Sequence, residues 1–241
     1  MDTSTILVVA ILFAAAYLQS ATGFGGAIVT MALVPLLLPV GDAIAYVSLV
    51  GLLVNGFIMF ANRAGFSLRH ATPLVLGMGL GIPIGYYSLR AVDGELVIRF
   101  LGAVLMLISV AEFLQKRFVR LAIPERTGTL FGMVGGILAG AFNVGGPPVV
   151  VYAYSRDWSK VEVVAILQTV FVAGALVRNL LMLNAGEITA DLLRLVAWSL
   201  PPAVAAVWLG KMTLDRLPQA WLRRIVFGLI FVIGLRYLVS G

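Results

Sequence analysis

The chain has 241 residues, of which 61% are hydrophobic and 12% are charged, and its formal net charge is +6. Soluble domains carry about 25% charged residues, whereas runs of about 20 apolar residues are typical of helices that cross a bilayer. Such runs recur along the whole chain, so the composition excludes a soluble domain. It predicts an all-α polytopic membrane protein embedded in a lipid bilayer.

Eight apolar segments follow one another along the chain, and two of them contain a break. The first interrupted segment covers 5–40 and includes QSATGFGGAIVT, and the second covers 128–156 and includes AGAFNVGGPPVVVY. Each is too long for one membrane helix and too short for two full ones, which favours a broken, re-entrant-like helical hairpin. The uninterrupted segments are 42–61, 70–90, 95–114, 160–182, 190–211 and 218–239.

The positions of the basic residues support the hairpin interpretation. If both interrupted segments enter and leave on one side, twelve of the seventeen Lys and Arg residues gather at one face. Cytoplasmic loops carry an excess of Lys and Arg, so 115–127 is predicted to be a cytoplasmic linker, with both termini outside. A single crossing by 128–156 would remove most of this bias. The twelve residues are Arg63, Arg69, Lys116, Arg117, Arg120, Arg126, Arg156, Lys160, Lys211, Arg216, Arg223 and Arg224.

The two halves of the chain match each other at an offset of 120 positions. The Gly-Gly pair at 25–26 corresponds to the pair at 145–146. Residues 1–114 and 128–241 each contain a broken hairpin followed by three transmembrane helices. An odd number of full crossings separates equivalent points, so the second repeat has inverted topology. Inverted repeats with broken helices are typical of secondary transporters, whose substrate sites lie near the membrane midplane.

The two breaks have the composition of an anion-binding site. Irregular backbone within a bilayer requires protein or water partners, so the breaks indicate a lined or watered cavity. Helices that begin at Ala27 and Pro147 would direct partly positive N-termini toward it, and the glycines permit close approach of a ligand. The candidate substrate-binding residues at the breaks are Gln19, Thr22, Gly23, Phe24, Gly25, Gly26, Asn143, Val144, Gly145, Gly146 and Pro147.

Further polar residues lie within the apolar segments. Tyr152 and Gln168 complete the candidate substrate-binding set, because polar groups inside a membrane are often functional. Gln168 is the repeat mate of Ser48, and the alternative role for both is an interhelical hydrogen bond. Arg178, near the outer end of its segment, is expected to extend its guanidinium to the membrane interface, although it could instead attract anions.

Other residues have a structural explanation. Asp42 and Glu162 stand at the starts of two segments, where a carboxylate compensates the helix dipole. Glycines spaced four apart are expected to let helices pack closely. They form two series, Gly77, Gly81 and Gly85 in one segment and Gly128, Gly132, Gly136 and Gly140 in another.

The sequence offers no pattern for other kinds of chemistry. His70 is the single histidine and cysteine is absent, so no metal site is expected. No cofactor fingerprint, buried acid pair or nucleophile motif occurs, which argues against an enzyme. The basic residues are spread over short loops, so nucleic acid is not an expected partner.

Two segments resemble the signature regions of a known family. GFGGAIVTMALVPLLLP at 23–39 and GGILAGAFNVGGPPVVVYAY at 135–154 are similar to those of the TauE/SafE family, also called the toluene sulfonate uptake permease family. The resemblance covers nearly the whole chain in order and spacing. It implies transport of sulfite or an organosulfonate, coupled to protons, across a bacterial inner membrane. It extends to Gly23, Gly25, Gly26, Asn143, Gly145, Gly146 and Pro147.

These observations together favour a secondary transporter for a small sulfur oxyanion that works by alternating access. One inverted half would move against the other and expose the cavity to each side in turn. A proton could travel on sulfite itself, because its second ionisation lies near neutrality. The alternatives are an anion channel, which would not show counterflow, and a membrane-embedded lipid-phosphate enzyme. Such an enzyme needs an acid or base at the breaks, where the sequence places amides and hydroxyls.

Overall fold

The computed structural model describes residues 3–90, 92–118, 123–213 and 219–240, and the side chains of 115–118, 213, 219–225 and 240 are outside this description. Throughout the described chain the regular structure is helical, as predicted. The helices are α1 (Thr3–Thr22), α2 (Gly26–Leu33), η1 (Val34–Leu36), α3 (Val40–Ala61), η2 (Arg63–Gly65), α4 (Leu68–Ser88), α5 (Gly94–Phe118), η3 (Glu125–Thr127), α6 (Gly128–Phe142), α7 (Gly146–Tyr154), α8 (Lys160–Asn184), α9 (Ala190–Thr213) and α10 (Gln219–Ser240).

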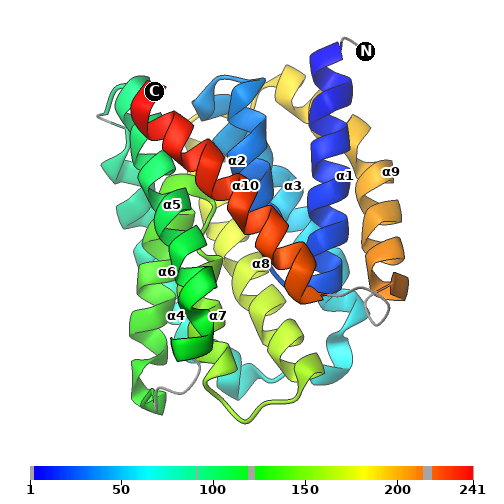
Figure 1. Ribbon diagram of the computed structural model, residues 1–241, viewed down its shortest axis with the longest axis vertical. Coiled ribbons are helices and arrows are strands. Elements are labelled where there is room, and N and C mark those ends of the chain that lie inside the picture. The colour runs from blue at the N-terminus through cyan, green and yellow to red at the C-terminus, as the bar shows by residue number, and fades with distance from the viewer. Residues whose placement is uncertain (1–2, 91, 119–122, 214–218, 241) are drawn as a thin grey trace.

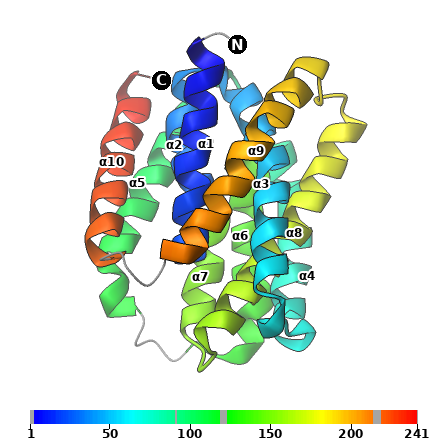
Figure 2. The ribbon, with the colours of Figure 1, turned by 90° about the vertical axis from the view of Figure 1, so that its right-hand side faces the viewer.

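Both chain ends lie at the same end of the bundle, called here the terminal end (Figure 1). The long helix α1 runs inward from this end and the short helix α2 turns back toward it (Figures 1 and 2). From the opposite end, called here the basic end, α6 runs inward and α7 turns back. This is the course of the chain that two hairpins require. The side chains of Lys116, Arg117, Arg120, Arg216, Arg223 and Arg224, which entered the charge prediction, lie outside the described residues.

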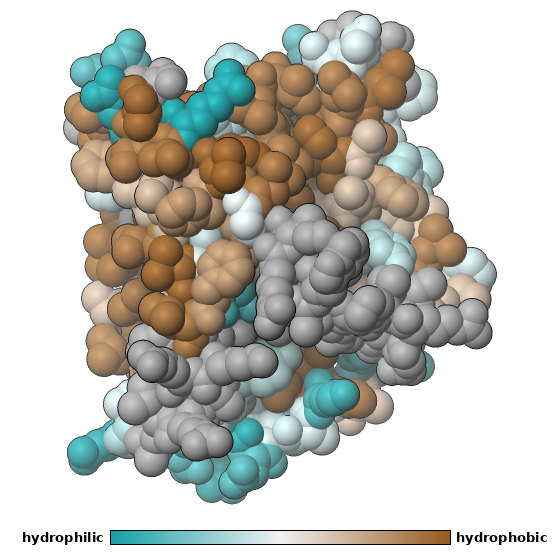
Figure 3. Space-filling model, viewed as in Figure 1, coloured by the Kyte–Doolittle hydropathy of each residue, from teal (hydrophilic) through white to brown (hydrophobic). Residues whose placement is uncertain are grey.

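The surface of the bundle is suited to lipid. Within the described chain, α1, α3, α5, α8 and α9 contain segments long and apolar enough to cross a membrane. Large hydrophobic side chains are exposed on several helices, for example Leu80 on α4 at 62% and Leu107 on α5 at 69%. An apolar surface of this extent is favourable in contact with lipid and unfavourable in water. On the face shown in Figure 3, hydrophobic side chains cover much of the upper part and the left side, and hydrophilic ones gather toward the two ends.

The two glycine series bring α4 and α6 into backbone contact. A Cβ atom built on Gly81 would lie 2.2 Å from the carbonyl oxygen of Met133, and one built on Gly140 would lie 2.2 Å from that of Ile82. No side chain fits at such distances, so each glycine is required by the neighbouring helix. The predicted role of these glycines in helix packing is confirmed.

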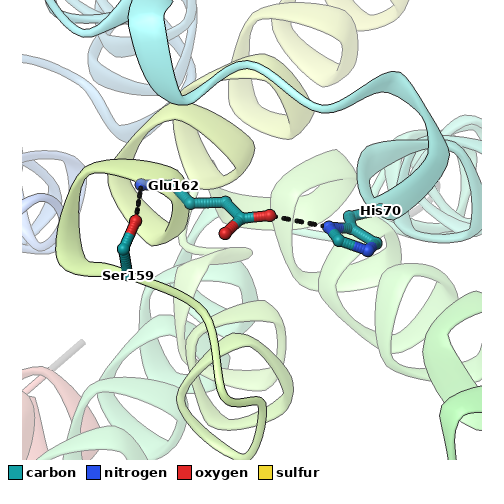
Figure 4. A network of polar contacts seen from close by, with 3 residues as sticks. All are labelled: His70, Ser159 and Glu162. Atoms are coloured by element: carbon teal, nitrogen blue, oxygen red, sulfur yellow. Dashed lines mark hydrogen bonds and ion pairs between the residues drawn. The ribbon is translucent and has the colours of Figure 1, made fainter.

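Polar contacts at the basic end join α4 to α8. Glu162 lies in the first turn of α8, as predicted, and Ser159 caps this turn by accepting a hydrogen bond from the Glu162 N–H at 3.3 Å. The Glu162 carboxylate also lies 2.8 Å from Nδ1 of His70 (Figure 4). The ring of His70 stacks on Trp158 with centroids 4.9 Å apart. His70 therefore ties two helices together, and the described residues contain no cluster of ligands for a metal ion.

Candidate anion-binding site

Each break is a short stretch of backbone whose conformation ends one helix and begins the next. Gly25 precedes α2 with φ of 98°, in the left-handed region that glycine adopts without strain. Asn143 ends α6 with φ of 58°, and asparagine is the side chain most often found in that conformation. The chain can therefore reverse direction at both points, and α2 and α7 begin at Gly26 and Gly146.

The two breaks border one internal cavity of about 70 Å³, called here the central cavity. One water needs about 10–15 Å³ measured in this way, so there is room for several waters or one small oxyanion. The N-terminal ends of α2 and α7 both contribute to its wall. Its polar lining residues are Gln19, Ser48, Asn55, Asn143 and Arg178, and its glycines are Gly25, Gly51, Gly145, Gly146 and Gly174.

Side chains of α8 donate hydrogen bonds to backbone carbonyl groups at both breaks. Gln168 donates from Nε2 to the carbonyl oxygen of Gly23 at 2.8 Å. Arg178 donates from Nη1 to the carbonyl oxygen of Ala139 at 3.0 Å and to that of Gly140. The C-terminal end of a helix is partly negative, and these donors offset that charge, most directly at α6. The partly positive N-termini of α2 and α7 both border the central cavity.

Arg178 brings a full positive charge to the wall of the central cavity. It is only 4% exposed, so the prediction that it extends to the membrane interface is wrong. The last carbonyl groups of α6 accept hydrogen bonds from the Arg178 guanidinium. They replace the acceptors that the guanidinium would find at the membrane interface. Its Nε has no hydrogen-bond partner, and no described carboxylate lies within ion-pair distance of it. A buried cation of this kind is costly unless an anion joins it.

Neutral hydrogen-bonding groups complete the lining. Nε2 of Gln19 donates to Oδ1 of Asn55, which joins α1 to α3. Nδ2 of Asn143 donates to the carbonyl oxygen of Ile44 at 2.7 Å. The hydroxyl of Ser48 donates to Oδ1 of Asn179 at 2.6 Å. Among the described residues, no aspartate or glutamate lines the central cavity. The site is therefore positive and rich in donors, which suits an oxyanion.

The structure brings together some of the predicted site residues and separates others. Those that line the central cavity are Gln19, Gly25, Asn143, Val144, Gly145 and Gly146. Those that do not line it are Thr22, Gly23, Phe24, Gly26, Pro147, Tyr152 and Gln168.

The residues outside the central cavity have structural contacts instead. Thr22 donates to the carbonyl oxygen of Phe24 at 2.7 Å and so shapes the first break. Gly26 lies against Gln19, with no space for a Cβ atom. Tyr152 donates to the carbonyl oxygen of Glu125 at 2.9 Å, near the basic end. Gln168 donates to the carbonyl oxygen of Gly23 and so holds the backbone of the first break rather than the cavity wall.

Three polar lining residues were not in the predicted set. Ser48 and Asn55 come from α3, and Arg178 comes from α8. The available signal was their polarity within apolar helices, and for Ser48 also its equivalence to Gln168 in the repeat. Depth along a helix was not a reliable guide, because it does not show which neighbour a side chain faces.

A multi-pass helical membrane protein with a cavity between two broken helices belongs to the class that moves solutes across membranes. Residues 7–237 match the family model described as sulfite exporter TauE/SafE. The chain belongs to this family, so it is a membrane transporter rather than an enzyme, as the resemblance implied.

A curated relative extends the comparison. The chain is 29% identical over 232 residues to a protein of Cupriavidus necator named "Probable sulfite/organosulfonate exporter TauE". The alignment covers 93% of this chain and 90% of the relative. No solved structure matches the chain.

Proposed function

We propose that this protein is a secondary transporter that moves a small sulfur oxyanion, sulfite or an organosulfonate, across a bacterial inner membrane by alternating access. The observation that carries the proposal is Arg178, a buried cation at the central cavity with no described carboxylate within ion-pair distance. A bound sulfite or sulfonate group would supply the missing charge and the missing acceptor. The family and the name of the curated relative support this class of substrate.

The substrate would lie between the N-termini of α2 and α7, within reach of Arg178 and the amides of Gln19 and Asn143. Oxyanions bind well to helix N-termini because several N–H groups converge there. Gly146 supports this role, since a Cβ atom built on it meets only Phe171, at 3.6 Å. The backbone at this point is thus open to a ligand in the cavity.

Inverted repeats provide the proposed alternation between the two sides. Helix order supports them, because a long and a short broken helix precede three long helices in each half. The contacts support them as well. α6 packs on α4 and α1 packs on α9, while α3 packs on α8 and α5 on α10. Each pairing is preserved when every helix is exchanged for its counterpart in the other half, as a twofold relation requires.

Coupling to protons would act through the substrate. The described lining of the central cavity holds no carboxyl group that could carry a proton. Sulfite can carry one itself, since its second ionisation lies near neutrality. Net direction then follows the gradients of anion and proton, and the name of the relative favours export.

Counterflow of radiolabelled sulfite in proteoliposomes tests the proposal. We expect saturable flux that unlabelled sulfite inside the vesicles accelerates and that organosulfonates inhibit. Asn143→Asp keeps the size of the side chain but adds a negative charge to the cavity, so it should abolish the flux. Asn62→Asp makes the same chemical change at the end of α3, outside the cavity, and should retain it. Flux without saturation or counterflow would indicate a channel instead.

A further inference from the structure

A second polar cavity opens at the terminal end of the molecule. It has a volume of about 510 Å³ and lies between α3, α4, α5, α6 and the connection from α8 to α9. We call it the terminal vestibule. Its charged lining residues are Asp42, Arg90, Arg178 and Glu187. Arg178 also lines the central cavity, so this one side chain belongs to the walls of both.

The inner wall of the terminal vestibule carries two buried polar groups without a partner. Tyr86 is 5% exposed, and its hydroxyl faces the Glu187 carboxylate without making a hydrogen bond of good geometry. Arg178 is 4% exposed, and its Nε has no hydrogen-bond partner. Both residues line the vestibule. Buried donors are normally paired, so two unpaired ones in the same wall indicate that a ligand with acceptor atoms completes them. An oxyanion has such atoms.

Arg90 stands at the mouth of the vestibule and is held in a defined orientation. Its guanidinium lies over the ring of Tyr86, 4.8 Å from the centroid, and 5.9 Å from that of Tyr87. Nη2 donates to a carboxylate oxygen of Glu187 at 2.6 Å. This hydrogen bond raises the pKa of Arg90, which keeps it charged. The carboxylate of Glu187 thus occupies the position that the oxyanion of a substrate would take on this cation.

We propose that Arg90 is an oxyanion-binding residue of a second substrate site in the terminal vestibule, and that Glu187 competes with the substrate for it. This inference rests on the proposed function, because it assigns a second binding site to the same sulfur oxyanion. An arriving sulfite or sulfonate group displaces the Glu187 carboxylate from Arg90 and receives hydrogen bonds from Arg90 and the Tyr86 hydroxyl. It then lies next to Arg178, from which the central cavity is reached.

The two members of the pair should act in opposite directions on substrate binding. Arg90→Gln removes the cation, so the half-saturation concentration for sulfite presented at the terminal end should rise about fivefold, the upper range for an exposed ion pair. Glu187→Gln removes the competitor, and the same concentration should fall about two- to fivefold. In the double variant, the Glu187 change should have little further effect, because it acts through Arg90.

The matched control is the pair Arg194 and Asp191 on α9, which are 3.0 Å apart and outside both cavities. Arg194→Gln and Asp191→Asn make the same charge changes near the terminal end. A cysteine introduced by Asp93→Cys marks the terminal end of the protein. Uptake of radiolabelled sulfite is measured in membrane vesicles that expose this cysteine on their outer surface. Thermal unfolding of each purified variant checks that it is folded.

The outcomes separate the two proposals. Opposite shifts for Arg90→Gln and Glu187→Gln, with unchanged controls, support the second site. Shifts of equal size in the control pair would mean that surface potential alone is responsible and would overturn it, as would wild-type values in both variants. A wild-type protein that shows no saturable sulfite flux would instead overturn the proposed function.

Discussion

Replacement of Arg178 by glutamine is the sharpest test of the central cavity. The substitution keeps a polar side chain but removes a charge that has no described carboxylate within ion-pair distance. Hydrogen bonds to a charged partner contribute about 1.5–3 kcal/mol, which corresponds to a factor of about 10–150 in affinity. We therefore expect the KM for sulfite to rise by about that factor. Arg178→Lys keeps a cation, so its KM for sulfite should rise less than that of Arg178→Gln.

Ligand-induced stabilisation gives the same quantity without transport. A ligand that binds only the folded state at 100 times its Kd stabilises it by about 2.7 kcal/mol. If the Kd rises 100-fold at the same concentration, the stabilisation falls to about 0.4 kcal/mol. Thermal unfolding of purified wild-type and Arg178→Gln protein, each with and without sulfite, measures this difference. The surface variant Arg194→Gln should respond to sulfite as the wild type does.

A structural role for Arg178 makes a different prediction. If the guanidinium only satisfies the carbonyl groups of Ala139 and Gly140, the glutamine variant should be less stable but respond normally to sulfite. A folded Arg178→Gln protein with wild-type KM and wild-type stabilisation by sulfite would refute the anion-binding role. Lost stabilisation in a protein that still folds would support it.

Three further tests address the topology, the breaks and the contacts that hold them. Thr127→Cys and Asp157→Cys place single cysteines before and after the second broken segment, and both should be labelled by an impermeant reagent from the cytoplasm; labelling of the two positions from opposite sides would contradict the hairpin. Gly146→Val should reduce transport strongly with near-normal expression, because the valine side chain enters the central cavity. Gly81→Val should instead lower the melting temperature, through a cost of about 1–3 kcal/mol from overpacking. Normal transport by Gly146→Val would show that Gly146 does not contribute to substrate binding. Gln168→Leu should destabilise the fold by about 1–3 kcal/mol, measured by thermal unfolding, because the Gly23 carbonyl group loses its buried donor; unchanged stability would show that water replaces the amide.

Much of the architecture could be predicted because membrane helices are specified by local sequence. Apolar length gives each span, and the Gly-Gly pairs mark the points where helices must break. The glycine series of α4 and α6 also predicted close packing, since a spacing of four places them on one helix face. These features depend on residues near one another in the chain.

The site was only partly predictable because its chemistry depends on distant contacts. Whether Arg178 reaches the interface or the cavity is decided by the carbonyl groups of α6, about 40 residues earlier in the chain. Tyr152 and Gln168 are as polar as Asn55, yet each is turned toward a backbone acceptor in another segment. Polarity within an apolar helix thus predicts a hydrogen bond, and only the packing of the bundle shows whether its partner is protein or substrate.

The contact between α4 and α6 limits how such a transporter can move. The two helices belong to different halves of the chain, yet their backbones touch along the glycine series and leave no slack for sliding. α1 and α9 pair across the halves in the same way. The rigid bodies of a transport cycle would therefore combine helices from both halves, rather than coincide with residues 1–114 and 128–241. One rigid body would contain α4 with α6, and the other would contain α9 with α1. Movement of either body would therefore shift the broken helix of one repeat together with a long helix of the other.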